Sequence, residues 1–270
     1  MIDRELHEEL RRQYNPEGSD LREMQLRLLE LLKTVDGICR RNGITYWLGS
    51  GTLLGAVRHG GFIPWDDDVD IEILRKDRKR FIKACNRELP PNLHIQCNET
   101  DPEYYPNILK VRDDSTDIGE KLLLGKWGEY DIQCKYRGYF IDVFCEEPCI
   151  PKLVDVSNTI LSRILALRYY KNRSAGLCRF LCKGMYLLNG VFRVISKLFA
   201  DKDVLYHGFS SCFNSRRSVR YIFPTREISF EGQVFQAPAD CEGHLTEIYG
   251  NYMELPSDKL RFGHHSNVSG

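Results

Sequence analysis

The pattern of apolar and polar residues predicts a helix followed by a short strand near the start of the chain. Between residues 21 and 41, apolar side chains recur every three or four positions, which is the period of an amphipathic helix. Asp20 is expected to cap the amino terminus of this helix, and Asn42 with Gly43 ends it. Residues 44–48 combine β-branched and aromatic side chains, so they predict a buried strand before a glycine-rich turn.

The next segments predict a small sheet with flanking helices. Residues 49–58 predict a turn that leads into a short helix, and residues 66–73 read DDDVDIEI. From Asp68 onward acidic and apolar residues alternate, so a strand would place the acidic side chains on one face and bury the others. Residues 76–89 predict a further helix, and residues 93–97, 107–112 and 138–145 predict strands.

The character of the chain changes after residue 150. Residues 152–200 show helical apolar periodicity and carry nine Lys or Arg against a single acid, Asp155. We therefore expect a mixed α/β core over residues 1–150, a basic helical insertion over 151–205, and a segment over 206–270 that packs back on the core. The basic helices of 152–200 have two interpretations: solvated faces, which are the more common case, or a peripheral contact with a membrane surface or an anionic acceptor.

Bulk composition excludes some classes of protein. The 270 residues carry 38 Lys plus Arg and 38 Asp plus Glu, so the zero net charge gives no reason to expect a nucleic-acid partner. The first ten residues contain no apolar signal region, and no stretch approaches the ~18 apolar residues of a spanning helix. We therefore expect a cytoplasmic protein, at the inner face of a membrane if it contacts one. Its ten irregularly spaced cysteines are then reduced thiols.

Four aspartates between residues 66 and 70 require compensation, because like charges this close repel one another. A solvated acidic turn is one explanation, which the alternation with buried apolar residues weakens. The other is a catalytic metal site in which Asp68 and Asp70 share a strand face and Asp142 supplies a third carboxylate from a neighbouring strand. Asp142 is the single acid of an apolar run, where an unpaired charge is costly. Oxygen ligands without histidine favour Mg²⁺ or Mn²⁺ over zinc.

Other residues are candidates for binding the phosphates of a substrate. Two metal ions could clamp the attacking and leaving oxygens of a phosphoryl displacement, which leaves the protein to position the donor and neutralise charge. A surface role for His59 and an edge-strand charge for Lys110 remain open alternatives, as do a disordered end and a general base for His264 and His265. The candidate substrate-binding residues are Gly49, Ser50 and Thr52 at the helix start, together with Arg58, His59 and Lys110.

Two segments of the sequence resemble a known family. Residues 46–59, YWLGSGTLLGAVRH, and residues 61–71, GFIPWDDDVDI, resemble the signature of the LicD family, which includes bacterial phosphorylcholine transferases and is related to the fukutins. The similarity extends weakly through KVRD at 110–113 and FIDVF at 140–144. It implies an α+β, nucleotidyltransferase-like fold of the DNA polymerase β type, with a small mixed sheet flanked by helices and a catalytic core in residues 1–150.

The resemblance also implies an activity. Family members would take a CDP-linked donor, such as CDP-choline or a CDP-polyol, and transfer its phosphoryl-alcohol group to a hydroxyl of a cell-surface glycan or its precursor, releasing CMP. The acceptor would be a sugar or polyol, including lipid-linked ones, of the kind found in lipopolysaccharide or teichoic acid. Gly49 and Ser50 would hold phosphate, and Asp68, Asp70 and Asp142 would bind the metals.

Two other functional classes stay open from the sequence. Asp68-Val69-Asp70 also fits the D-x-D motif of glycosyltransferases, although the 67 preceding residues contain mostly helix and one strand rather than a full nucleotide-binding βαβ region. A glycan-binding protein without activity would be expected to lack one of the three carboxylates, and all three are present. The alcohol transferred and the acceptor glycan are not defined by these patterns.

Overall fold

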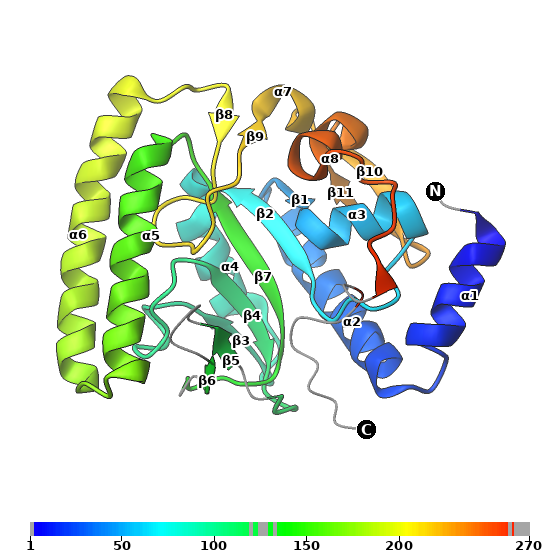
Figure 1. Ribbon diagram of the computed structural model, residues 1–270, viewed down its shortest axis with the longest axis horizontal. Coiled ribbons are helices and arrows are strands. Elements are labelled where there is room, and N and C mark those ends of the chain that lie inside the picture. Colours follow the sequence, from blue (N-terminus) through cyan, green and yellow to red (C-terminus); the bar gives the residue numbers. More distant parts are fainter. Residues whose placement is uncertain (1–2, 119–120, 124–128, 132–133, 259–260, 262–270) are drawn as a thin grey trace.

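A five-stranded mixed sheet forms the centre of the computed structural model, which describes residues 3–118, 121–123, 129–131, 134–258 and 261. Its strands lie in the order β1-β2-β7-β4-β3; β2 and β7 are parallel, and all other neighbours are antiparallel (Figure 1). The strands are β1 (Tyr46–Leu48), β2 (Asp70–Leu74), β3 (Leu93–Gln96), β4 (Leu109–Asp113) and β7 (Tyr139–Glu146). The predicted fold class, a small mixed sheet flanked by helices, is confirmed.

The two faces of this sheet differ in chemistry because side chains alternate along each strand. One face carries apolar residues such as Ile71 and Val143, which join the main core with Leu28 and Leu32 of α2 (Asp20–Arg41). Helix α4 (Arg78–Glu88), preceded by the 3₁₀ turn Arg75–Asp77, adds Phe81 to the same core. The opposite face carries the acidic residues of β2 and β7, so the sheet separates core packing from polar chemistry.

Two local predictions are wrong, while the other predicted elements of the first 150 residues lie within two residues of the observed bounds. The cap of α2 is Ser19, whose Oγ accepts a hydrogen bond from the backbone N–H of Arg22, and Asp20 is already helical. Strand β2 begins at Asp70 rather than at Asp68. The buried side chain of Gln25 holds the preceding residues 63–66 as a turn, because its Nε2 donates to the carbonyl oxygens of Ile63 and Asp66.

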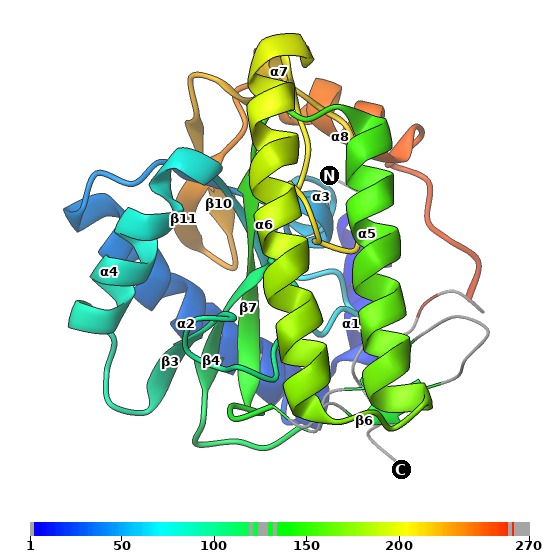
Figure 2. The ribbon, with the colours of Figure 1, turned by 90° about the vertical axis from the view of Figure 1, so that its left-hand side faces the viewer.

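A helical hairpin covers one side of the molecule. Helices α5 (Pro151–Leu165) and α6 (Ala175–Phe199) are joined through a π-helical turn, Ala166–Tyr170, and lie side by side at the front of Figure 2. Their contact is apolar and includes Leu161 of α5 and Cys182 of α6. These helices correspond to the helical pattern of residues 152–200. Among the residues that the structure describes, no helix is long and apolar enough to cross a membrane.

The remaining elements lie at the two ends of the chain and around the sheet. Helix α8 and the β10–β11 pair contact helix α3 and strand β1, so the carboxyl-terminal segment returns to the amino-terminal half of the chain (Figure 1). Strands β5 and β6 pair with each other, as do β8 and β9. The bounds are α1 (Arg4–Tyr14), α3 (Ser50–His59), β5 (Lys121–Leu123), β6 (Glu129–Asp131), β8 (Val204–Leu205), β9 (Arg217–Ser218), α7 (Val219–Ile222), β10 (Arg226–Phe230), β11 (Gln233–Ala237) and α8 (Cys241–Tyr249).

Candidate active site

The turn between β1 and α3 is fastened to the start of β2. The backbone N–H of Gly49 donates to the carbonyl of Asp70 over 3.0 Å, and the N–H of Asp70 donates to Thr52 Oγ1 over 2.8 Å. A side chain at position 49 would come within 2.9 Å of Glu72, so glycine allows this close approach. The first intrahelical bond runs from Leu53 to Gly49, which leaves the N–H groups of residues 50–52 at the open amino end of α3. This end therefore lies beside Asp70.

Asp70 and Asp142 lie side by side on neighbouring strands at this point. Asp70 and Asp142 are direct partners in the parallel pairing of β2 with β7, and the N–H of Asp142 donates to the carbonyl of Val69 over 2.9 Å. Burial raises the pKa of Asp70 well above its ordinary value, and the neighbouring charges of Asp68 and Asp142 raise it further. Asp68 and Asp142 are therefore close enough to Asp70 for their charges to raise its pKa, but among the described residues the aspartates whose oxygens lie within 4.8 Å of one another are Asp66, Asp67 and Asp68, not the predicted three.

Asp66 and Asp67 extend this acidic group. One carboxylate oxygen from each of Asp66, Asp67 and Asp68 lies within 4.8 Å of the others. Burial raises the pKa of Asp66, followed by the charges of Asp68 and Asp67. The sequence hypothesis gave neither Asp66 nor Asp67 a role, although the run of aspartates contained the signal. A donor set made of carboxylate oxygens suits a hard divalent cation.

Lys110 provides the cation closest to Asp142. The two residues are cross-strand partners, and Lys110 Nζ lies 2.8 Å from Asp142 Oδ1 and 3.4 Å from the centre of the Phe140 ring. Strand β4 lies between β7 and β3, and Lys110 is buried. The edge-strand interpretation of Lys110 is therefore wrong, and its charge offsets part of the acidic group.

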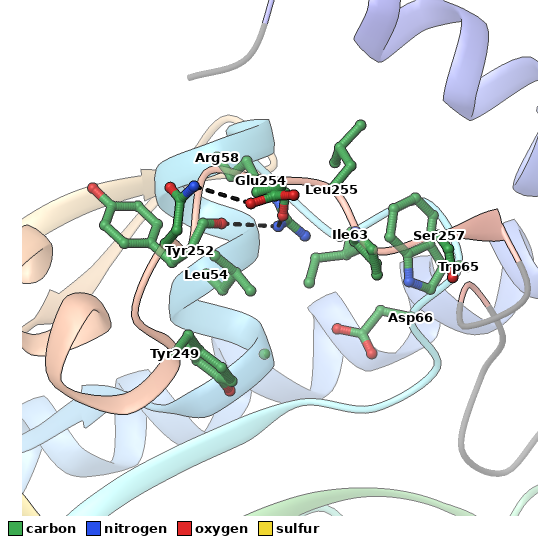
Figure 3. A pocket seen from close by; sticks show the side chains of 13 residues that line it. Leu54, Arg58, Ile63, Trp65, Asp66, Tyr249, Tyr252, Glu254, Leu255 and Ser257 are labelled. Carbon is green, nitrogen blue, oxygen red and sulfur yellow. Dashed lines mark hydrogen bonds between the residues drawn. The ribbon is translucent and has the colours of Figure 1, made fainter.

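A cavity of about 610 Å³ opens next to Asp66. Figure 3 shows Asp66 and Arg58 on opposite sides of it, with Tyr249 between α3 and the carboxyl-terminal segment. The guanidinium of Arg58 donates to the carbonyl oxygens of Tyr252 and Glu254, and burial lowers its pKa to about 10. The lining consists of Gly51, Leu54, Arg58, Ile63, Trp65, Asp66, Tyr249, Asn251, Tyr252, Glu254, Leu255, Pro256 and Ser257.

His59 supports Arg58 from behind the cavity. Its Nε2 lies 3.0 Å from Arg58 Nε, its Nδ1 lies 3.2 Å from Nδ1 of His7, and its ring meets Trp65 edge to face. Burial, followed by the charges of Arg58 and His7, lowers the pKa of His59 to about 3. The surface interpretation of His59 is therefore wrong, and the neutral ring positions Arg58. His264 and His265 lie outside the described residues.

Tyr249 is a site residue that the sequence did not indicate. It lines the cavity at the end of α8, and burial together with the charge of Asp70 raises its pKa. The loop-like composition of residues 249–260 carried no signal for this placement, because the contact joins α8 to a strand 179 positions earlier in the chain.

A buried polar network supports the strands beneath the acidic group. Arg217 Nε lies 2.7 Å from Glu72 Oε1, its Nη2 lies 2.8 Å from His207 Nε2, and His207 in turn hydrogen-bonds Glu146. Trp47 Nε1 donates to the second carboxylate oxygen of Glu72 over 2.6 Å. Burial lowers the pKa of His207 to about 3 and raises that of Glu146 to about 7. Because a guanidinium contacts both Glu72 and His207, this cluster fixes strand positions rather than forming a second metal centre.

Several known proteins are similar in sequence to this chain. Residues 43–101 match LicD/FKTN/FKRP, nucleotidyltransferase domain. The chain is 27% identical to Lipopolysaccharide cholinephosphotransferase LicD of Haemophilus influenzae, over 91% of this chain and 96% of that protein. It is 50% identical over 50 residues to Ribitol 5-phosphate transferase FKRP of Homo sapiens, which covers 18% of this chain and 10% of that protein.

The mixed sheet and the similarity to named phosphotransferases identify the chain as a transferase of nucleotidyltransferase-like fold. Residues 43–101 match the LicD/FKTN/FKRP domain and most of the chain is similar to a LicD protein, so the resemblance inferred from its motifs is confirmed.

Proposed function

We propose that this protein transfers a phosphoryl-alcohol group from a CDP-linked donor to a hydroxyl of a cell-surface glycan or its precursor, releasing CMP. The observation that carries the proposal is the pairing of Asp70 with Asp142 beside the open amino end of α3. The names of the relatives, a cholinephosphotransferase and a ribitol 5-phosphate transferase, support a substituted phosphate as the group transferred.

The acidic group fits Mg²⁺ or Mn²⁺, held by Asp68, Asp70 and Asp142. Its donors are carboxylate oxygens, which hard cations prefer. Burial, followed by the charges of Asp68 and Asp142, raises the pKa of Asp70, and a bound divalent cation would favour its ionised form. When bound, such an ion would neutralise charge on the phosphate oxygens during transfer.

The residues of the chain have separate roles in this proposal. The N–H groups at the start of α3, around Ser50, bind donor phosphate oxygens, and Lys110 holds Asp142 in place while offsetting its charge. Arg58 presents a cation to the cavity, and the carboxylate of Asp66 accepts a hydrogen bond from a substrate hydroxyl. In the transfer itself, the acceptor oxygen forms a bond to phosphorus as the bond between phosphorus and the CMP oxygen breaks, and the hydroxyl proton is released to solvent water.

Removing one carboxylate tests the proposal directly. We expect Asp70→Asn and Asp142→Asn to lower kcat for CMP release at least about a hundredfold, because each removes a charge from the group that would hold the cation. The assay would supply CDP-choline, CDP-ribitol or CDP-glycerol with an oligosaccharide acceptor, with and without Mg²⁺. Glu227→Gln, in an exposed ion pair, is the control for handling and folding. Near wild-type turnover by either aspartate variant would refute the roles assigned.

The melting temperature separates this activity from the D-x-D glycosyltransferase alternative. A CDP-linked donor with Mg²⁺ should stabilise the protein, since a ligand that binds only the folded state raises the melting temperature. Stabilisation by UDP-sugars alone would favour the glycosyltransferase. Strand β1 is the one strand that precedes Asp68 in the part of the chain described, which argues against a nucleotide-sugar βαβ region.

A further inference from the structure

The outer surface of α6 carries an apolar stripe. Phe180, Leu187 and Leu198 are 72%, 76% and 72% exposed, and Val191 and Val194 are exposed between them. At about 100° per residue, these five positions fall within roughly 60° of arc. They form one continuous line along the 25-residue helix, which lies at the surface of the molecule in Figure 2. These five residues are called the outer stripe below.

The outer stripe is not the face that α6 uses for packing. The buried residues of α6, which include Cys178, Cys182 and Met185, lie on the opposite side and contact α5 and Tyr105. The helix is therefore apolar on two opposite sides, although only one of them is covered by the protein. A surface helix of a globular protein normally presents charged or polar residues on its outer side.

The charged residues of α6 share one sign. Arg179, Lys183, Arg193 and Lys197 are its charged residues, and the helix contains no Asp or Glu. Arg179, Lys183 and Lys197 lie along one flank of the outer stripe by the same helical spacing. Near the amino-terminal end of α6, a cavity of about 510 Å³ is lined by Asn98, Pro102, Gly176, Arg179, Phe180 and Lys183. Arg179 is half exposed and lies 3.2 Å from Glu103, so part of its charge is balanced within the chain, while Lys183 beside the Phe180 ring suits an anionic headgroup phosphate at an apolar boundary.

We propose that α6 is a membrane-docking helix that lies in the interface of an anionic lipid bilayer, with the outer stripe among the acyl chains and the basic flank on lipid phosphates. Charge favours this occupant over a second copy of the chain. Arg179 pairs with Glu103 and Arg193 with Glu147, but two copies paired through their outer stripes would still bring Lys183 and Lys197 of one copy near those of the other, and α6 has no acidic residue to balance them. An anionic bilayer supplies the missing negative charge. Membrane docking by α6 is independent of the reaction proposed for the active site.

Vesicle co-sedimentation of the full chain tests the docking helix. Wild-type protein should bind vesicles of phosphatidylcholine with 30 mol% phosphatidylglycerol, more weakly at high salt, and should bind pure phosphatidylcholine vesicles poorly. Leu187→Glu/Leu198→Glu should lower the binding constant at least tenfold, because it places two acids in the apolar boundary. The control is Val234→Glu, the same change at an exposed apolar residue of β11. It should bind like the wild type.

The basic flank is tested with neutral substitutions. Arg179→Gln/Lys183→Gln should weaken binding to anionic vesicles several-fold and reduce its salt dependence, since two phosphate contacts are lost. Brominated acyl chains should quench the fluorescence of a tryptophan introduced by Phe180→Trp, but not that of one introduced by Val234→Trp.

The proposal is overturned if the wild type does not bind anionic vesicles, or if the Leu187→Glu/Leu198→Glu variant binds them equally well. It is also overturned if sedimentation velocity shows a wild-type dimer that this variant dissociates while vesicle binding is unchanged.

Discussion

Asp142 illustrates how a single residue can indicate a site from the sequence. A lone acid within an apolar strand requires a partner, and the structure supplies Lys110 across one strand pair and Asp70 across the other. The sequence could predict that Asp142 has a charged partner, but not that this partner is Lys110. Glu72 shows the limit more clearly, because the alternation placed it on the acidic face while its partner, Arg217, lies 145 positions later.

His59 gives a residue-scale prediction about pH. The unfolded chain binds a proton at His59 below its ordinary pKa of 6.5, whereas the folded chain does so only near the lowered value of about 3. The contribution of His59 to stability is therefore present above pH 6.5 and is lost as the pH falls. Between pH 7 and pH 5.5 the free energy of unfolding should fall by roughly 1 kcal/mol from this residue.

Urea denaturation of the wild type and of His59→Gln at both pH values measures this effect. The variant should lose roughly 1 kcal/mol less than the wild type over the interval, because glutamine does not titrate there. Equal losses in both proteins would mean that His59 is already protonated in the folded state at pH 5.5.

At the scale of elements, periodicity predicted the helices and strands whose own side chains decide their structure. Where tertiary contacts decide whether a segment forms a strand, the pattern of apolar residues was insufficient to predict it. The alternation around Asp68 suggested strand, yet Gln25 of α2 holds residues 63–66 as a turn and the strand starts at Asp70. The short pairs β8–β9 and β10–β11 form among residues whose pattern predicted only mixed elements.

Two helical glycines should respond to the same substitution with opposite signs. A Cβ at Gly55 in α3 would lie 2.5 Å from the carbonyl oxygen of Gly61, whereas one at Gly184 in α6 would meet nothing within 4 Å. Gly55→Ala should therefore cost about 1–3 kcal/mol through overpacking, and Gly184→Ala should stabilise by about 0.5–1 kcal/mol through helix propensity. Thermal and urea unfolding measure both changes. A stabilising effect of Gly55→Ala would contradict the close packing of α3 on the loop before Asp66.

At the scale of the whole molecule, the carboxyl-terminal segment completes the site built by the first 150 residues. Arg217, Tyr249 and the carbonyls that bind Arg58 all come from beyond residue 205. Glu231 joins the two parts as well, since it pairs with Arg22 over 2.7 Å and accepts from the N–H of Phe62. Sequence patterns could not show these contacts, because each joins residues more than 140 positions apart.

Two glutamates of this segment form a matched test. Glu231 pairs with the buried Arg22 of α2, while Glu227 pairs with the more exposed Arg40 of the same helix. Glu231→Ala should cost about 3 kcal/mol, because it leaves the buried guanidinium of Arg22 with only the exposed Glu17, at 3.5 Å, as an acidic partner among the described residues, and Glu227→Ala should cost less than about 1 kcal/mol. Denaturation midpoints report the difference. Similar losses would show that Glu231 does not hold the loop that leads into β2.

The contrasting faces of β2 and β7 also constrain how the chain reaches its folded state. If β2 paired with β7 one residue out of step, Asp70 and Glu72 would turn into the apolar layer under α2, and Ile71 would turn toward the cavity side. Such a misaligned sheet would have to bury several carboxylates at once, so it would open again before the rest of the chain could pack on it. The acids proposed to act in the reaction would therefore also fix the strand register during folding, and replacing them with apolar residues would make the strands easier to pair in the wrong register.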